Sequence, residues 1–130
     1  MSSAPFVLDV PAEPQNLGTA RTFATRVAAH FGCDDDTVLD LRLAVSEACT
    51  ESMATPSPSG GTVRVSLQPG VDRLRIEITG IGSFAGQDGV PSRTGQPTRL
   101  ELIRTLFPDA LVARVKDGMF ALRFSVPTRD

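Results

Sequence analysis

The chain has 130 residues, a length typical of one globular domain with its own hydrophobic core. Thirteen lysines and arginines against fifteen aspartates and glutamates give a net charge of -2, so the composition carries no basic footprint for nucleic acid. With 41% hydrophobic residues, 22% charged residues and no apolar run of membrane-spanning length, the sequence predicts a soluble domain that neither binds nucleic acid nor enters a membrane.

The patterning of apolar residues predicts a single succession of short elements. Alternation indicates strands, three- and four-residue spacing indicates helices, and prolines and glycines mark the ends. The predicted order is a strand over 5–10, helices over 14–31 and from the acidic cap at 33–36 to about residue 53, hairpin strands over 62–67 and 73–78, a helix over 99–107, and closing strands over 110–115 and 119–126. Prolines on both sides confine the first strand to an edge or a strand end.

The second predicted helix carries the most information. Its apolar positions recur at helical spacing: Val38, Leu41, Val45 and Ala48. Leu39 and Leu43 are predicted to widen this stripe to most of a helical face, which should pack on a large core. Glu47 and Glu51 lie on one face, and like charges at this spacing oppose a helix by a few tenths of a kcal/mol, roughly. Either solvent screens these carboxylates, or they have a functional role.

The glycine-rich stretch from about residue 80 to 98 separates the hairpin from the third helix. It holds five of the eleven glycines and two of the ten prolines. Loops of this length inside a compact domain are usually lids, binding loops or disordered segments. We therefore expect a flexible lid loop over about 80–98.

The cysteines and the single histidine argue against a structural metal. Two cysteines and one histidine cannot complete a zinc site without carboxylates. Cys49, within the apolar helix, is expected to be a small buried side chain, and the acidic residues after Cys33 disfavour its thiolate. The first residues lack a basic segment followed by a long apolar core, so no secretory signal is predicted and we expect a cytoplasmic protein.

The order of elements predicts one α+β domain over residues 1–130: a two-layer sandwich, with a mixed, mostly antiparallel sheet and about three helices on one face. This arrangement resembles the anti-sigma-factor serine kinases, relatives of the histidine kinase-like ATPases that share the Bergerat nucleotide-binding fold. The resemblance covers nearly the whole chain, and its most specific part is AVSEACT at residues 44–50.

The resemblance implies ATP and Mg²⁺ as cofactors and gives roles to the two helix carboxylates. Glu47 falls on the position of the general base, which accepts the proton of the serine hydroxyl that is phosphorylated. The family has a Mg²⁺-binding asparagine four residues later, where this chain has Glu51. A carboxylate can ligate Mg²⁺, but it adds negative charge beside the phosphates.

Two glycine motifs of the family are altered in this chain. Gly80 replaces the aspartate that accepts from the adenine amino group; Gly82 is kept, and Phe84 stands at the next glycine position. Before the last helix Gly95 survives, whereas Arg99 occupies a position where the backbone should approach phosphates closely. Together with Glu51, the positions Gly80, Gly82, Gly95 and Arg99 are the expected cofactor contacts. Three altered motifs predict weakened or lost ATP binding, although Arg99 could still meet a phosphate electrostatically.

Three functions remain open. The first is an anti-sigma-type regulator that works by partner-switching contacts with a sigma factor, an anti-anti-sigma factor and a second copy of itself. The second is an active ATP- and Mg²⁺-dependent serine kinase, with Glu47 as base and Glu51 as metal ligand. The third is a pocket that holds another ligand under the lid loop. We favour the first, because the scaffold is intact while the nucleotide motifs are altered.

Overall fold

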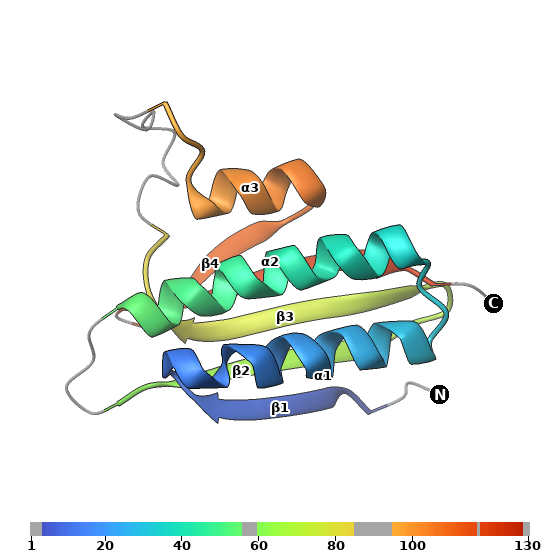
Figure 1. Cartoon of the computed structure of the whole chain (residues 1–130), viewed down its shortest axis with the longest axis horizontal. Helices are drawn as coiled ribbons and strands as arrows, with labels where there is room; N and C mark the ends of the chain where they lie inside the picture. The colour runs from blue at the N-terminus through green and yellow to red at the C-terminus, as the bar shows by residue number, and fades with distance from the viewer. Residues whose placement is uncertain (1–3, 56–59, 85–94, 117, 129–130) are drawn as a thin grey trace.

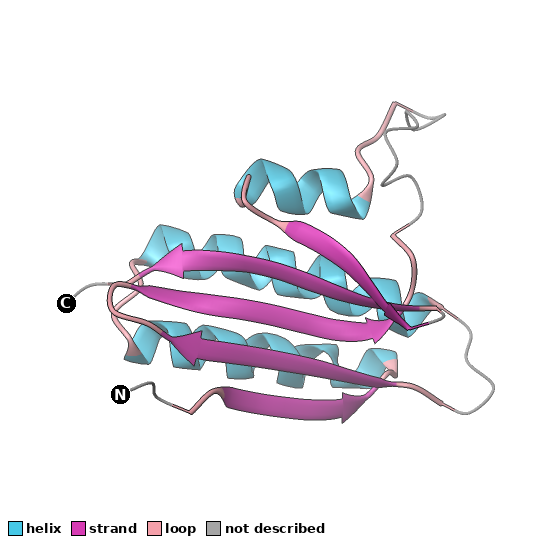
Figure 2. Cartoon of the chain, turned by 180° about the vertical axis from the view of Figure 1, so that it is seen from behind, coloured by secondary structure: helices cyan, strands magenta, loops and turns pink. Residues whose placement is uncertain are grey.

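A computed structural model of the chain shows a five-stranded sheet with three α-helices on one of its faces, as Figure 1 and, from behind, Figure 2 show. The structure describes residues 4–55, 60–84, 95–116 and 118–128. Its elements are β1 (Phe6–Pro11), a 3-10 turn η1 (Pro14–Asn16), α1 (Leu17–His30), α2 (Asp35–Ala54), β2 (Thr62–Pro69), β3 (Arg73–Ile81), α3 (Arg99–Leu106), β4 (Leu111–Lys116) and β5 (Met119–Pro127). The predicted α+β two-layer sandwich is confirmed.

The sheet has the strand order β1-β2-β3-β5-β4, and its four pairings are antiparallel. β1 is therefore an edge strand, as its flanking prolines predict. The side chains of β2, β3 and β5 alternate, so that one set faces the helices and the other lies on the uncovered face. Cross-strand partners such as Ile76 and Phe124 are buried on the helix side.

The helices pack on this apolar face through small side chains. Ala20, Ala24 and Ala28 form a fully buried row on α1. α2 lies between α1 and α3 (Figure 1), so three of its sides are covered by protein. The predicted widening of the α2 stripe was wrong, because Leu39 and Leu43 lie on the remaining side and are 55% and 49% exposed.

Polar side chains cap the starts of two helices, and the sequence predicts the first of these caps. The Asp34 side chain accepts a hydrogen bond from the amide of Thr37 at 2.8 Å, which caps α2. Thr98 caps α3 in the same way, with its hydroxyl oxygen 3.1 Å from the Glu101 nitrogen.

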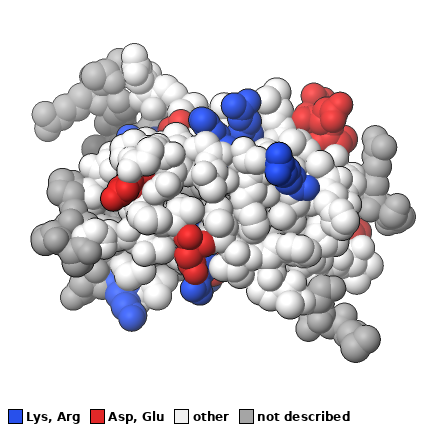
Figure 3. All heavy atoms as spheres, turned by 60° about the horizontal axis from the view of Figure 1, so that its bottom comes forward, with Lys and Arg blue, Asp and Glu red and all other residues white. Residues whose placement is uncertain are grey.

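The expected lid falls largely outside the residues that the structure describes, namely at 85–94. Its predicted start was too early, because Gly80 and Ile81 still belong to β3. None of the helices in the described part of the chain is long and apolar enough to cross a membrane. On the face shown in Figure 3, acidic and basic side chains are scattered among uncharged ones.

Both cysteines are buried and reduced. Burial raises the pKa of the Cys49 thiol to about 12. Burial, and to a smaller extent the charge of Asp34, also raises the pKa of Cys33. The two thiols are thus held in the neutral form, as the sequence predicts.

Candidate functional site

The residues singled out from the sequence meet where the C-terminal half of α2 faces the end of β3 and the start of α3. The two carboxylates, Glu47 and Glu51, come from successive turns of α2, and Arg99 is the first residue of α3. Gly80 and Gly82 lie at the end of β3 and just after it. Residues from segments that are far apart in the sequence therefore lie close together, as the residues of a binding or catalytic site do.

Glu51 lies at the centre of this cluster, and its side chain is only 11% exposed. Its Oε2 accepts two backbone hydrogen bonds, from Phe84 N at 3.0 Å and from Ser83 N at 3.3 Å. Its Oε1 accepts from Arg99 Nη1 at 3.0 Å. Because a buried charge needs partners, three charge-assisted donors explain how this carboxylate is accommodated.

Arg99 lies beside both of the like charges on α2. Its Nε lies 3.9 Å from Glu47 Oε1, while its Nη1 contacts Glu51. One guanidinium thus faces both carboxylates and offsets their repulsion. Glu47 is the more accessible of the two, with 34% of its side chain exposed.

Gly80 leaves a space that a neighbouring side chain fills. A Cβ built at Gly80 would lie 2.5 Å from the Ser52 Oγ and 3.0 Å from the Ser52 Cβ. Ser52 is 1% exposed, and its hydroxyl has no hydrogen-bond partner in the described part of the chain. Sequence analysis did not single out Ser52, because a serine on a helix carries no signal of such a contact.

Gly82 lies against Glu51 in the same way. A Cβ at Gly82 would be 2.9 Å from the Glu51 Cγ, and the backbone there has a φ of +146°, which favours glycine. Two residues later Phe84 has a φ of +51° and is 1% exposed. Its ring packs edge-on against Phe120, with the ring centroids 4.6 Å apart.

Gly95 does not join this cluster. Its φ of +76° explains the glycine, but among the described residues, its chain neighbours aside, no atom lies within 4 Å of the position of a Cβ there. The structure therefore brings Glu47, Glu51, Gly82 and Arg99 into contact and places Gly80 beside Ser52, whereas Gly95 is apart.

The arrangement does not fit a Mg²⁺ ion bound by Glu51. Both carboxylate oxygens are already used, one by Arg99 and the other by two amides. A guanidinium 3.0 Å from the carboxylate would also repel a divalent cation. In the part of the chain that the structure describes, no cluster of three or more histidine, cysteine, aspartate or glutamate side chains could hold a metal.

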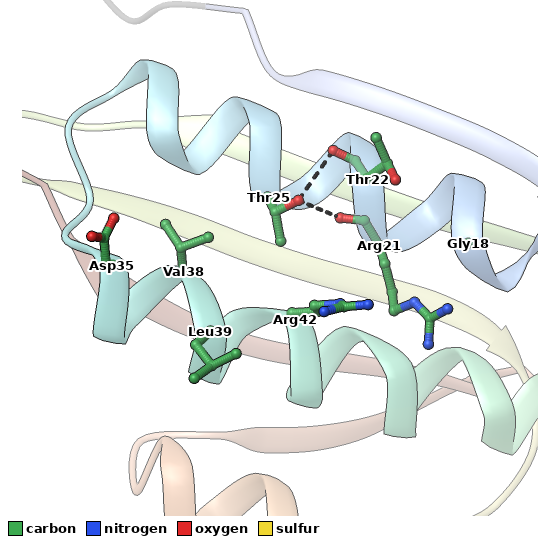
Figure 4. A pocket seen from close by; sticks show the side chains of 8 residues that line it. All are labelled: Gly18, Arg21, Thr22, Thr25, Asp35, Val38, Leu39 and Arg42. Carbon is green, nitrogen blue, oxygen red and sulfur yellow. Dashed lines mark hydrogen bonds between the residues drawn. The ribbon is translucent and has the colours of Figure 1, made fainter.

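A second feature, a groove of about 390 Å³, separates the outer sides of α1 and α2. Figure 4 shows Arg21 from α1 and Arg42 from α2 reaching into it. Val38 and Leu39 add an apolar wall, and the carboxylate of Asp35 also lines the groove, near the start of α2. Sequence analysis did not single out this groove, although Arg21 lies outside the buried row of the first helix.

Comparison with known proteins assigns the family. The family model described as the histidine kinase-like ATPase domain matches residues 10–118. The chain belongs to this family. A crystal structure of the RsbU and RsbW domains of a Mycobacterium tuberculosis protein matches the fold with a TM-score of 0.71 over 98% of this chain and 34% of that one, at 15% sequence identity.

Curated relatives confirm the resemblance to anti-sigma-factor kinases. The chain is 35% identical over 71 residues to "Serine-protein kinase RsbW" of Bacillus velezensis, covering 55% of this chain and 44% of that one. It is 30% identical over 88 residues to the protein of that name from Halalkalibacterium halodurans, covering 68% and 54%. It is 36% identical over 72 residues to "Anti-sigma-F factor RsbW" of Mycobacterium tuberculosis, covering 55% and 42%. The chain thus spans about half the length of these relatives.

Proposed function

We propose that this domain is an anti-sigma-type regulator that works by partner-switching contacts, with weakened or lost ATP binding. The names of its relatives support the class, since they are serine-protein kinases and an anti-sigma factor. The main support for weakened or lost ATP binding is that Glu51 makes its hydrogen bonds within the chain. A side chain at the expected Mg²⁺ position that already binds Arg99 and two amides is not free for a metal.

The surroundings of Gly80 support the same conclusion. The expected acceptor for an adenine amino group is absent there, and Ser52 fills the space that an acceptor side chain would need. A buried amino group without an acceptor loses roughly 0.5–1.5 kcal/mol of net hydrogen bonding. Adenine would therefore be bound less tightly and with less selectivity.

Calorimetric titration of the natural protein with ATP, with and without Mg²⁺, tests the nucleotide half of this proposal. We expect no binding at millimolar ATP. Micromolar binding would contradict the loss of nucleotide function and would favour the hypothesis of an active serine kinase.

The groove between α1 and α2 supports the partner half of the proposal. No carboxylate among the described residues pairs with the guanidinium of Arg21 or Arg42, so these groups are available to an acidic segment of a partner. We propose the sigma factor as the protein bound there. The anti-anti-sigma factor and a second copy of the domain are the other partners that the family implies.

Co-purification with candidate sigma factors tests this surface. Arg21→Glu should abolish or strongly weaken capture, because it places a negative charge in the groove. Arg26→Glu is the matched control, since Arg26 is exposed on the same helix and does not line the groove. Equal loss of capture in both variants would reject the groove as the contact surface. Light scattering of the purified protein tests the expected homodimer.

The alternative is an active serine kinase, and the exposure of Glu47 favours it. This carboxylate is 34% exposed, and its one ionic contact among the described residues, to Arg99, is long at 3.9 Å. It could therefore approach a serine hydroxyl and accept its proton. Labelled phosphate transfer to a partner serine, abolished by Glu47→Gln, would establish this reading.

A further inference from the structure

The Glu51 carboxylate lies in a cradle of three donors, formed by the amides of Ser83 and Phe84 and by the Arg99 guanidinium. Consecutive amides next to a residue with positive φ form a concave arrangement that binds anions in many proteins. A guanidinium binds carboxylate and phosphate with similar geometry. This donor set is therefore suited to an oxyanion in general, and not only to a glutamate.

We propose that this cradle is an oxyanion site whose resident ligand is the chain's own Glu51. The inference rests on the proposed function and gives a cause for weakened ATP binding. Because Glu51 is tethered to the cradle, it competes at a high effective concentration with any phosphate from solution. An external anion reaches the donors only after this carboxylate leaves.

The resident carboxylate also connects three parts of the fold. It ties the C-terminal half of α2 to the residues after β3 and to the first residue of α3, contacts that span 33 and 48 residues of sequence. The connection is made by the chain's own residues alone. Partner binding is then expected to be independent of ATP.

Glu47 is the control residue for a test of this site. It is also a glutamate on α2 and also faces Arg99, but it accepts no backbone amide in the described residues. Removing Glu51 should leave Ser83 N and Phe84 N without an acceptor and Arg99 with only its long contact to Glu47. Removing Glu47 should leave the cradle filled.

The experiment compares Glu51→Ala, Glu47→Ala and the natural protein. Each is titrated with acetate, inorganic phosphate and pyrophosphate at constant ionic strength, with chloride as the control anion. The thermal midpoint and the amide NMR signals of Ser83 and Phe84 are followed. Acetate replaces the lost carboxylate, while the phosphates report whether the cradle also accepts phosphoryl groups.

We expect saturable stabilisation of Glu51→Ala and shifts of both amide signals. Its anion affinity should be on the order of tenfold to a hundredfold higher than that of the other two proteins, as the loss or gain of a charge-assisted hydrogen bond predicts. A folded Glu51→Ala protein that responds no more than Glu47→Ala would overturn the proposal. If Glu51→Ala is unfolded, recovery of folding by acetate or phosphate but not chloride supports it, and absence of recovery rejects it.

The outcome separates this inference from the proposed function. If the natural protein does not bind ATP and Glu51→Ala gains no anion response, the cradle is rejected while the regulator proposal stands. If the natural protein binds ATP tightly and Glu51→Ala responds to anions, the cradle stands and the loss of nucleotide function is rejected.

Discussion

The contact between Gly80 and Ser52 predicts that a single methyl group added to β3 destabilises the domain. A Cβ at Gly80 would lie 2.5 Å from the Ser52 Oγ and 3.0 Å from its Cβ, against about 3.5–4.0 Å for relaxed contacts. Overpacking of this kind costs about 1–3 kcal/mol, and the lower chain entropy of alanine returns about 0.4–1 kcal/mol. Gly80→Ala should therefore lower the free energy of unfolding by about 1–2 kcal/mol.

The same geometry predicts that Ser52→Ala relieves part of this cost. It removes the hydroxyl that lies nearest and that has no partner among the described residues, so by itself it should be neutral or stabilising by about 1 kcal/mol. In the Ser52→Ala background, Gly80→Ala should cost about 1 kcal/mol less than in the natural protein. Such coupling exceeds the error of about 0.5 kcal/mol within which independent substitutions add.

Urea unfolding of the two single variants and the double variant measures the cycle. Gly18→Ala on α1 is the control, because a Cβ there meets no described atom within 4 Å beyond its chain neighbours and the backbone of its own helix, and alanine favours a helix. It should stabilise equally in both backgrounds. An additive cycle, or a Gly80→Ala variant as stable as Gly18→Ala, would refute the packing argument.

Three further predictions concern caps and ionisation. Asp34→Ala should lower stability by about 1 kcal/mol in urea unfolding, because the Thr37 amide loses its cap; no change would contradict the cap. Since the folded Cys49 thiol keeps its proton to a pKa of about 12, the free energy of unfolding should fall by up to about 1.4 kcal/mol per pH unit above about pH 9. Cys49→Ala should flatten this slope, and an unchanged slope would refute the assignment. The hydrogen bond from Arg64 lowers the pKa of Asp9, so its stabilisation is present above the ordinary value near 4 and lost as pH falls through the lower folded value. Asp9→Asn should therefore matter at neutral pH and not in strong acid, as unfolding curves at both pH values will show.

The succession of elements could be predicted from the sequence because its causes are local. Alternation, helical spacing and the Asp34 cap each act within a few residues, and the structure bears out the order they predict. Which side of α2 stays in solvent is not local, since it depends on where α1 and α3 pack. For this reason Leu39 and Leu43 were wrongly expected to be buried.

The candidate site could be predicted only one residue at a time. Glu51, Gly80 and Arg99 were each recognised as departures from the family pattern. Their contacts join positions as many as 48 residues apart, and no spacing in the sequence indicates that Arg99 binds Glu51. The role of Ser52 was invisible for the same reason, because it becomes apparent only from the backbone of β3 beside it.

Seen together, these departures depend on one another sterically and electrostatically. Without a side chain at Gly80 there is room for Ser52, and without one at Gly82 there is room for the Glu51 stem. The extra negative charge of Glu51 is matched by Arg99 and by the amide of Phe84, whose ring in turn packs on Phe120. Restoring the family's residue at one position alone would disturb the packing around it. For example, a Cβ at Gly80 would clash with the Ser52 side chain. A variant intended to restore the whole nucleotide site must therefore change α2, the end of β3 and the start of α3 together, because restoring a side chain at Gly80 alone should cost stability.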